Sequence, residues 1–359
     1  MLKKLKKLTT RMIVGANVAT IILMLLVGYS DMVSPVSHPL LANIGLLFPV
    51  VLFANAAFLV FWLICKWRYS LIPLLGFLFA YVPVRKYMPL NVSREHPAEA
   101  IKVLSYNVLA FGDAGQPKDD SNEIVQYLLE VDADIVCLQE AGGEIAEERR
   151  IGQLLDSVYQ YKEVSTKPSG ECIALLSKFP ILSSEQIPYE SVGNLSVAYR
   201  VLIDGDTVLV VNNHLETTGI SLHQREQFKD LVKGDLETDT AQQASKLLMV
   251  KLGETAQIRA PQAEAVAQYV EAHKQYPVIL CGDFNDGPNS YSHRVIADQL
   301  VDCYVESGNG PGISYNRSGF YVRIDNIMCS KEWVPYQCRV DSKINASDHF
   351  PIMCWLKKR

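Results

Sequence analysis

The chain has 359 residues and a net charge of −5, which allows one large domain and an additional module. The charge is uneven, because residues 1–90 hold nine Lys or Arg and one acid, whereas residues 91–359 hold 25 bases and 38 acids. An acidic domain repels phosphate backbones, so this balance argues against a processive or architectural DNA-binding protein. It argues less against a metal enzyme, because bound cations change the field at their site.

Three uncharged stretches occupy most of residues 1–90. They contain 19 residues between Arg11 and Asp31, 34 between Asp31 and Lys66, and 16 between Arg68 and Arg85. A bilayer core of about 30 Å requires about 20 apolar residues in a helix, so the first two stretches predict transmembrane helices. The third is shorter and predicts either a third span or a re-entrant segment. Residues 1–90 are therefore expected to form a membrane anchor with two to three helices.

The basic residues predict how the anchor is oriented. The first stretch resembles a signal peptide, but its apolar core is long and no small-residue cleavage site follows it. The basic N-terminus and Lys66-Trp67-Arg68 are expected on the cytoplasmic side, which fits a hairpin. If the third stretch spans a bacterial inner or plasma membrane, the rest of the chain faces outward, and if it is re-entrant, the rest is cytoplasmic. Arg85, Lys86 and the cysteines of residues 91–359 argue weakly against the outward side.

Residues 91–99 form a polar linker in this interpretation, and residues 100–359 a mixed α/β domain. Strands are predicted over 100–108, 134–138, 172–176, 197–201, 207–211, 278–281, 324–328 and 351–356, and helices over 122–131, 144–158 and 263–273. Residues 222–258 predict a charged helical insertion, which is either a solvated excursion or a substrate lid or membrane-facing element.

No pair of cysteines has the spacing of a zinc finger. Residues 91–359 contain seven cysteines, and this odd number argues against a complete disulfide framework. Cys137 and Cys281 lie in strand-like runs and predict buried thiols. The last four are the ones able to pair in an oxidising compartment, namely Cys303, Cys329, Cys338 and Cys354.

Six short polar clusters each lie at the end of an apolar run of the domain. They are Ser105-Tyr106-Asn107, Leu138-Gln139-Glu140, Asn212-Asn213-His214-Leu215-Glu216, Gly282-Asp283-Phe284-Asn285-Asp286, Arg323-Ile324-Asp325-Asn326 and Ser347-Asp348-His349-Phe350-Pro351. Because each cluster follows an apolar run, the six together predict a site assembled from strand ends. Carboxylates, amides and imidazoles of this kind can hold a divalent metal ion and transfer protons.

The order of these clusters resembles that of the endonuclease/exonuclease/phosphatase superfamily, which includes deoxyribonucleases, inositol polyphosphate phosphatases and neutral sphingomyelinases. The resemblance covers about residues 100–359. It implies a four-layer sandwich of two mixed β-sheets flanked by helices, here preceded by the transmembrane segment. It also implies a Mg²⁺ cofactor, with Mn²⁺ as a possible substitute.

The resemblance also implies roles for individual residues. The metal ligands would be Glu140, with Asn107 and Asp348. The catalytic residues would be His214, which contacts the phosphate, Asp283, which orients or deprotonates water, Asn285, which binds a phosphoryl oxygen, and Asp325, which orients the proton-transferring His349. How the acid and base roles divide between the Asp and the two His stays open.

Two further residues are candidates for substrate binding. Arg259 lies in Arg259-Ala260-Pro261-Gln262, which is expected to open a helix near the phosphate or on the surface. Tyr315 lies in a Gly-rich, aromatic segment before Asp325, which predicts either a rim for the leaving group or an ordinary hairpin.

The sequence therefore predicts a membrane-anchored, Mg²⁺-dependent phosphoesterase that hydrolyses a phosphodiester or a phosphomonoester. The substrate would be a lipid head group, another small phosphoester or nucleic acid, and no obligate protein partner is inferred. A nuclease is the alternative within the same chemistry. A catalytically inactive membrane-binding module is the alternative of a different class.

Overall fold

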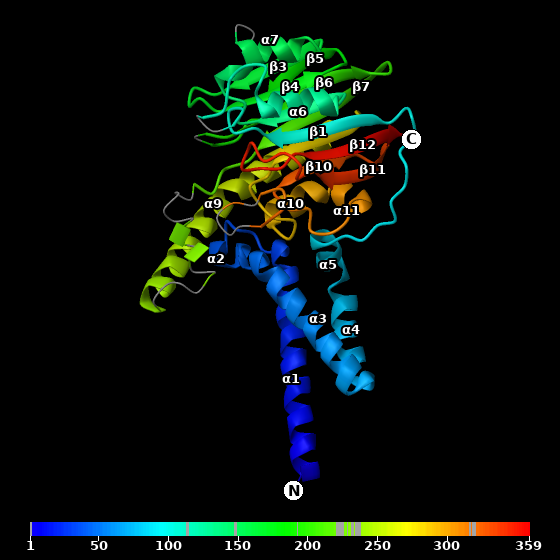
Figure 1. The fold of residues 1–359 in the computed structure, drawn as a ribbon, viewed down its shortest axis with the longest axis vertical. Coiled ribbons are helices and arrows are strands. Elements are labelled where there is room, and N and C mark those ends of the chain that lie inside the picture. Colours follow the sequence, from blue (N-terminus) through cyan, green and yellow to red (C-terminus); the bar gives the residue numbers. More distant parts are fainter. Residues whose placement is uncertain are drawn as a thin grey trace.

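A computed structural model describes residues 2–112, 115–146, 149–191, 193–219, 226–227, 229–230, 233, 238–315, 317 and 321–359. A helical stalk made by the first ninety residues carries an α/β domain at one end, and the N-terminus lies at the other end (Figure 1).

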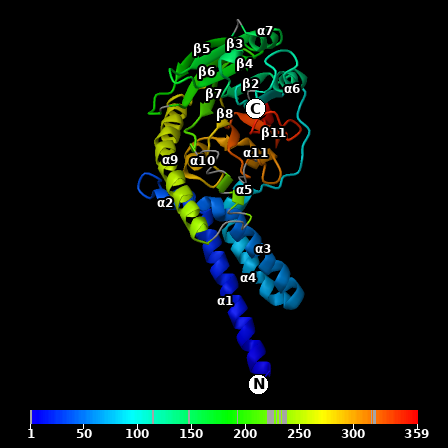
Figure 2. The same ribbon diagram turned by 60° about the vertical axis from the view of Figure 1, so that its left-hand side comes forward.

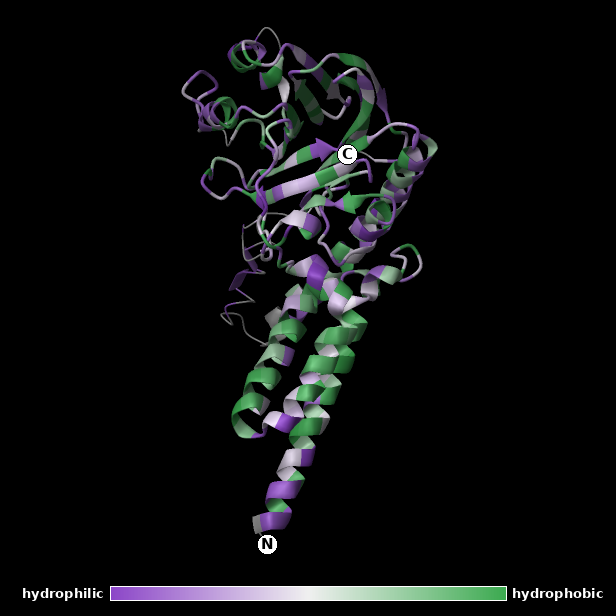
Figure 3. Cartoon of the chain, turned by 90° about the vertical axis from the view of Figure 1, so that its right-hand side faces the viewer, coloured by the Kyte–Doolittle hydropathy of each residue, from purple (hydrophilic) through white to green (hydrophobic). Residues whose placement is uncertain are grey.

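The stalk consists of apolar helices joined by short turns. The main helices are α1 (Leu2–Gly28), α3 (Phe48–Cys65), α4 (Leu71–Phe79) and α5 (Tyr81–Tyr87). The connecting elements are η1 (Ser30–Met32), α2 (Pro39–Ala42), η2 (Ile44–Leu47) and η3 (Trp67–Ser70). Two helical stretches, Lys3–Met32 and Pro39–Cys65, are long and apolar enough to cross a membrane, and the third pair is bent by 71° after Phe79. Figure 3 shows that the residues of these helices are mostly hydrophobic and that the N-terminal end of α1 is hydrophilic.

A chain of hydrogen bonds joins α1, α3 and α4 inside the stalk. Trp62 Nε1 donates to Asn17 Oδ1 over 3.1 Å, and Asn17 Nδ2 donates to Asn55 Oδ1 over 3.3 Å. Asn55 Nδ2 then donates to the Pro73 carbonyl over 3.2 Å. All three polar side chains are buried, so each finds its partner on a neighbouring helix where water is excluded.

The domain contains two β-sheets, as the family resemblance implied, and each has six strands. The first has the order β11-β12-β1-β2-β4-β3 and the second β5-β6-β7-β8-β10-β9. Their strands are β1 (Ile101–Asn107), β2 (Ile135–Gln139), β3 (Tyr161–Thr166), β4 (Cys172–Ser177), β5 (Ile181–Gln186), β6 (Leu195–Ile203), β7 (Asp206–His214), β8 (Val278–Asp283), β9 (Val301–Asp302), β10 (Asp325–Cys329), β11 (Trp333–Val340) and β12 (Ile352–Lys358).

Successive side chains of a strand point to opposite faces of its sheet, so the apolar residues pack in three layers, one between the sheets and one outside each sheet. Val103 and Ile279 face the interior between the two sheets, whereas their neighbours Leu104 and Leu280 face helices on the outside. The helices on the first sheet are α6 (Glu123–Val131) and α7 (Arg150–Asp156), and those beside the second are α9 (Thr238–Ala272) and α10 (Tyr291–Ala297). A further helix, α11 (Cys303–Ser307), packs against β11 of the first sheet and β10 of the second. The fold is therefore the predicted four-layer sandwich of mixed sheets flanked by helices.

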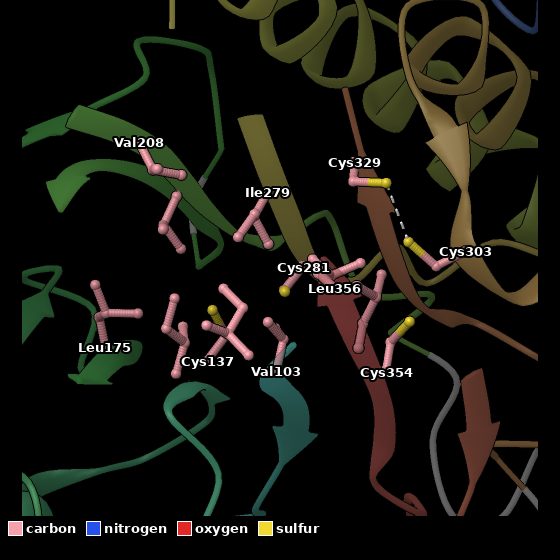
Figure 4. Close-up of a cluster of buried hydrophobic side chains, with 14 of the residues drawn as sticks. Val103, Cys137, Leu175, Val208, Ile279, Cys281, Cys303, Cys329, Cys354 and Leu356 are labelled. Carbon is pink, nitrogen blue, oxygen red and sulfur yellow. Dashed lines mark hydrogen bonds between the residues drawn. The ribbon is translucent and has the colours of Figure 1, made fainter. Parts of the chain in front are cut away.

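Buried thiols contribute to the interior between the sheets. Cys137 and Cys281 are fully buried, which confirms the prediction for this pair. All eight cysteines are unpaired, and the Sγ atoms of Cys303 and Cys329 lie 3.6 Å apart (Figure 4).

Two helices differ from their predictions. The helix expected over 144–158 is reduced to a turn, η4 (Gly143–Ile145), and α7, with residues 147–148 outside the described residues. The helix expected to open at Arg259 is instead the middle of α9, which continues through Pro261. An interior proline costs about 3 kcal/mol, and here tertiary contacts override it, because Gln262 Nε2 donates to the Glu190 carbonyl over 3.0 Å. The insertion predicted over 222–258 ends inside α9, beyond the midpoint of this helix, and much of residues 222–237 lies outside the described residues.

We predict that Asn17→Leu destabilises the association of the stalk helices by about 1 kcal/mol, because it leaves Trp62 Nε1 and Asn55 Oδ1 without their partner. Unfolding of the full chain in detergent micelles measures the change. Val18→Leu, at an exposed neighbouring position, is the matched control and is expected to have little effect. Equal effects of the two substitutions would contradict the role of this network.

Candidate active site

Parallel pairing brings four of the polar clusters to one end of the sandwich. In the first sheet β1 runs parallel to β2, and in the second β7 runs parallel to β8, so each pair ends at the same edge. Asp325 differs from the prediction, because it begins a strand instead of following one. Since β10 runs antiparallel to β8, this first residue lies directly opposite Asp283, and His214 lies opposite Asp283 on the other side.

Asn107 joins the two sheets at this end. Its Nδ2 donates to Glu140 Oε1 over 3.0 Å, within the first sheet, and to Asp283 Oδ2 over 3.2 Å, in the second sheet. The Leu109 amide donates to Asn107 Oδ1 over 3.2 Å, which fixes the orientation of the side-chain amide. Glu140 is the more open of the two carboxylates, with 32% of its side chain exposed, whereas Asp283 is 1% exposed.

Asp283 lies between two imidazoles. Its Oδ2 atom is 3.6 Å from His349 Nε2 and 3.8 Å from His214 Nε2. Burial raises the pKa of Asp283, the two histidines oppose the rise, and the result is a pKa of about 6. The carboxylate at the centre of the site therefore holds its proton more strongly than an ordinary Asp.

His349 is held by a carboxylate on its other nitrogen. Its Nδ1 donates to Asp325 Oδ2 over 2.8 Å, and Asp325 is itself fully buried. Burial lowers the pKa of His349, but the charges of Asp325 and Asp283 outweigh it and raise the pKa to about 10. The Tyr315 ring packs against this imidazole in a T-shaped arrangement, with centroids 5.1 Å apart.

His214 is held in the same way by Glu171, which sequence reasoning missed. The Nδ1 atom donates to Glu171 Oε1 over 2.6 Å. Burial lowers the pKa of His214, but the hydrogen bond to Glu171 and the charge of Asp283 raise it to about 9. Glu171 precedes the first residue of β4 and follows no apolar run, so the pattern that identified the other clusters does not include it.

A second layer of polar groups lies beneath Asn107 and was also not predicted. Gln139 Nε2 donates to Asn212 Oδ1 over 2.7 Å, from one sheet to the other. Asn212 Nδ2 donates to the carbonyls of Leu138 and Ala174, both over 3.0 Å. These buried hydrogen bonds fix the two sheets relative to each other under the site.

The chain turns sharply after two of the site strands. Glu140 has a φ of 50° and Asn285 a φ of 51°, both in the left-handed region. The Asn285 amide donates to Asp283 Oδ1 over 2.7 Å, and its Nδ2 donates to the Leu215 carbonyl over 3.1 Å. Gly282 permits the close strand packing, because a Cβ there would lie 2.0 Å from the Asn213 carbonyl oxygen.

The last cluster closes the site from the first sheet's side. The Ser347 hydroxyl donates to the Asn107 carbonyl over 2.7 Å, and the His349 amide donates to the Ser347 hydroxyl over 3.2 Å. Asp348 lies between these two residues, is half-buried, and its charge contributes to raising the pKa of His349.

Arg259 occupies a different place from the one expected. Arg259 is buried on the side of α9 that packs against the domain. Its Nη1 donates to the Glu216 carbonyl over 3.1 Å, and its Nε lies 3.5 Å from Asp286 Oδ2. It therefore braces the loop one residue after Asn285. A direct contact of Arg259 or Tyr315 with substrate stays a prediction.

The donor atoms of the site fit a hard divalent cation. The carboxylates near the two imidazoles are those of Glu140, Glu171, Asp283, Asp325 and Asp348. Buried Asp325 Oδ1 has no hydrogen-bond partner among the described residues. Asp283, Asp325 and His349 place ligand atoms within 4.8 Å of one another. Within this group, His349 Nδ1 already donates a hydrogen bond to Asp325 Oδ2. The set predicted from the sequence, Glu140, Asn107 and Asp348, offers oxygen ligands, which Mg²⁺ prefers. The ligand roles stay a prediction.

Comparison with known proteins identifies relatives for both parts of the chain. Residues 104–349 match the family model described as the endonuclease/exonuclease/phosphatase family, and residues 10–87 match a domain of unknown function, DUF8431. A search of curated proteins finds no match.

Solved structures share the fold at low sequence identity. Humanized TDP2 from D. rerio is 18% identical, with a TM-score of 0.52, over 72% of this chain and 99% of that one. The human Nocturnin catalytic domain with bound sulfate is 17% identical, with a TM-score of 0.52, over 72% and 95%. Sphingomyelinase C from Streptomyces griseocarneus is 16% identical, with a TM-score of 0.50, over 72% and 99%.

The matched residues 104–349 make up more than half of the chain and include every member of the site from Asn107 to His349. The chain therefore belongs to the endonuclease/exonuclease/phosphatase family, whose members are enzymes that hydrolyse phosphoester bonds.

Proposed function

We propose that the protein is a membrane-anchored phosphoesterase that uses Mg²⁺ and an attacking water molecule. The observation that carries this proposal is the position of Asp283, which lies between two imidazoles and is joined through Asn107 to Glu140. In this proposal a proton acceptor, two imidazolium groups and an oxygen-rich metal site would surround one point, an arrangement that suits in-line attack at phosphorus.

The residues divide the chemistry as follows. Glu140, Asn107 and Asp348 would hold the ion, which when bound neutralises charge on the phosphoryl oxygens. Asp283 orients the water and accepts its proton. His214 and Asn285 contact the phosphoryl oxygens, and His349, oriented by Asp325, supplies a proton to the leaving oxygen.

The stalk supports an outward-facing domain. Lys66 Nζ donates to Thr10 Oγ1 over 2.8 Å, so the basic ends of α1 and α3 lie on one side of the stalk. The pair α4–α5 then returns to the opposite end, where the domain lies (Figure 1). Basic segments favour the cytoplasmic side, and we therefore propose that the third segment spans and that the domain lies outside the cytoplasm of a bacterial inner or plasma membrane.

We predict that Glu140→Gln lowers kcat/KM by at least about 10²-fold, because it removes the carboxylate of the proposed metal site. Hydrolysis of bis(p-nitrophenyl) phosphate and p-nitrophenyl phosphate by the detergent-solubilised chain, with Mg²⁺ or with EDTA, measures this and separates diesterase from monoesterase activity. Glu130→Gln, an exposed change on α6, is the control. Undiminished turnover in EDTA would refute the metal-dependent mechanism.

We predict that Asp325→Asn and His349→Ala each lower kcat by about 10²–10⁴-fold, and that the double variant is no worse than the poorer single variant. The reason is that Asp325 acts through the imidazole that it orients. Steady-state kinetics of the three variants tests this, with His273→Ala as a control on a distant histidine. Additive losses would show that the two residues act independently.

A nuclease is the second candidate, because one solved neighbour is D. rerio TDP2 complexed with a single-strand DNA product. Nicking of plasmid DNA by the wild-type chain, lost in His349→Ala, would favour it. The excess of acids over bases in residues 91–359 weighs against it.

A further inference from the structure

The loop that follows the central carboxylate rests on the stalk. This loop joins β8 to α10, and its residue Asn289 lies six positions after Asp283. Asn289 packs so closely on Gly45 that a Cβ added at Gly45 would lie 2.5 Å from the Asn289 carbonyl oxygen. Its Nδ2 also donates to the Pro83 carbonyl over 3.4 Å. Because six residues span at most about 21 Å, Asp283 lies within that distance of this contact.

A second attachment reaches the strand that carries Asp325. Arg323, two residues earlier, is buried and donates from Nη2 to the Lys86 carbonyl over 2.6 Å. Its guanidinium lies 4.4 Å from the Tyr304 ring centroid, and Nη1 donates to the Pro311 carbonyl over 3.0 Å. The Lys86 side chain in turn forms an ion pair with buried Asp31, between the first two long helices. This attachment ties β10 to the end of α5.

Helix α9 makes a third contact, with the same end of the stalk. A Cβ at Gly253 would lie 3.0 Å from the Pro39 carbonyl oxygen, and Gln257 Nε2 donates to the Val36 carbonyl over 3.2 Å. Figures 1 and 2 both show α9 beside α2, with α10 between the second sheet and the stalk. Two strands of the site and one covering helix are therefore all fixed to one surface.

That surface is apolar enough to lie at the boundary of a bilayer. The stalk crown, defined as residues 29–47, joins α1 to α3 and makes most of these contacts. Six of its large apolar side chains are 40–60% exposed, namely Met32, Val36, Leu40, Leu41, Leu46 and Leu47. Tyr81, which begins α5 at the same end, is 59% exposed and is of the residue type that gathers at membrane interfaces.

We infer that the substrate is a phosphoester carried by a lipid of the bilayer in which the stalk is embedded. The contacts hold the catalytic end of the domain at the lipid surface, within reach of head groups of the same membrane. The acidic domain repels long polyanions, whereas a lipid phosphate reaches the site by diffusion in the membrane plane. This inference rests on the proposed function and adds the substrate class to it.

The test compares lipid in the protein's own membrane with lipid in another membrane. The full chain is reconstituted with Mg²⁺ in vesicles of ³²P-labelled total membrane lipid from its natural source, or in unlabelled vesicles mixed with labelled, protein-free vesicles. Release of ³²P to water or to a new lipid species is measured. The expected rate is at least tenfold higher when label and protein share a vesicle. The same preparations are assayed on soluble bis(p-nitrophenyl) phosphate.

A matched pair of glycine variants tests the contact itself. Gly45→Leu drives a side chain into Asn289 and is expected to lower cleavage of lipid in the same vesicle at least tenfold, with hydrolysis of the soluble diester within twofold of wild type. Gly15→Leu makes the same chemical change where nothing lies within 4 Å, and is expected to alter neither rate. If Gly45→Leu fails to fold, the comparison of the two vesicle arrangements with the wild-type protein still tests whether lipid of the same membrane is the substrate.

The outcomes separate this inference from the function on which it rests. Hydrolysis of the soluble diester without any cleavage of lipid, or with equal rates in the two vesicle arrangements, overturns the inference and leaves the phosphoesterase intact. Cleavage of plasmid DNA in preference to lipid overturns it in favour of a nuclease. Failure to hydrolyse any phosphoester overturns both.

Discussion

The hydrogen bonds of one amide, that of Asn107, determine how the two sheets meet at the site. The amide donates to a carboxylate on each sheet, Glu140 and Asp283, and its own oxygen is held by the backbone. A buried donor left without a partner costs about 1–3 kcal/mol, so a shift of either sheet is opposed at this point. The Gln139–Asn212 hydrogen bond beneath it resists the same shift. The carboxylates of Glu140 and Asp283, to which we assign the metal-binding and proton-accepting roles in our proposal, are thus held in register by the core of the fold.

Charge is concentrated where the core would otherwise be apolar, and it is balanced by pairing. Each imidazole has one nitrogen on a dedicated carboxylate, Asp325 or Glu171, and the other turned toward Asp283. Isolated buried charges are costly, but alternating acids and imidazoles stabilise one another. The pairing also orients both rings, so that both Nε2 atoms lie near the same carboxylate oxygen of Asp283.

The sequence predicted those residues of the site whose positions follow from strand order and chain direction. Asn107, Glu140, His214 and Asp283 follow apolar runs, and parallel strands bring such residues to a common edge. Glu171 was not predicted as a site residue, because it precedes its strand. Its position beside His214 depends on antiparallel strand pairing, which no local sequence pattern reveals. The predicted helix start near Pro261 was wrong for a related reason. Proline is a local helix breaker, but here the helix continues through it and is held by contacts with residues 45 or more positions away. The docking of the stalk on the catalytic end likewise arises from pairs of residues far apart in the chain.

Gly282 has a consequence for how such enzymes diverge. A side chain at Gly282 would clash with the backbone of the neighbouring strand at Asn213, so glycine is required here for a reason unrelated to what the enzyme cleaves. The residue before the central carboxylate is therefore closed to substitution whatever the substrate. Specificity has to change elsewhere, on the outer loops and on the face turned toward the stalk, where side chains can vary without forcing β7 and β8 apart.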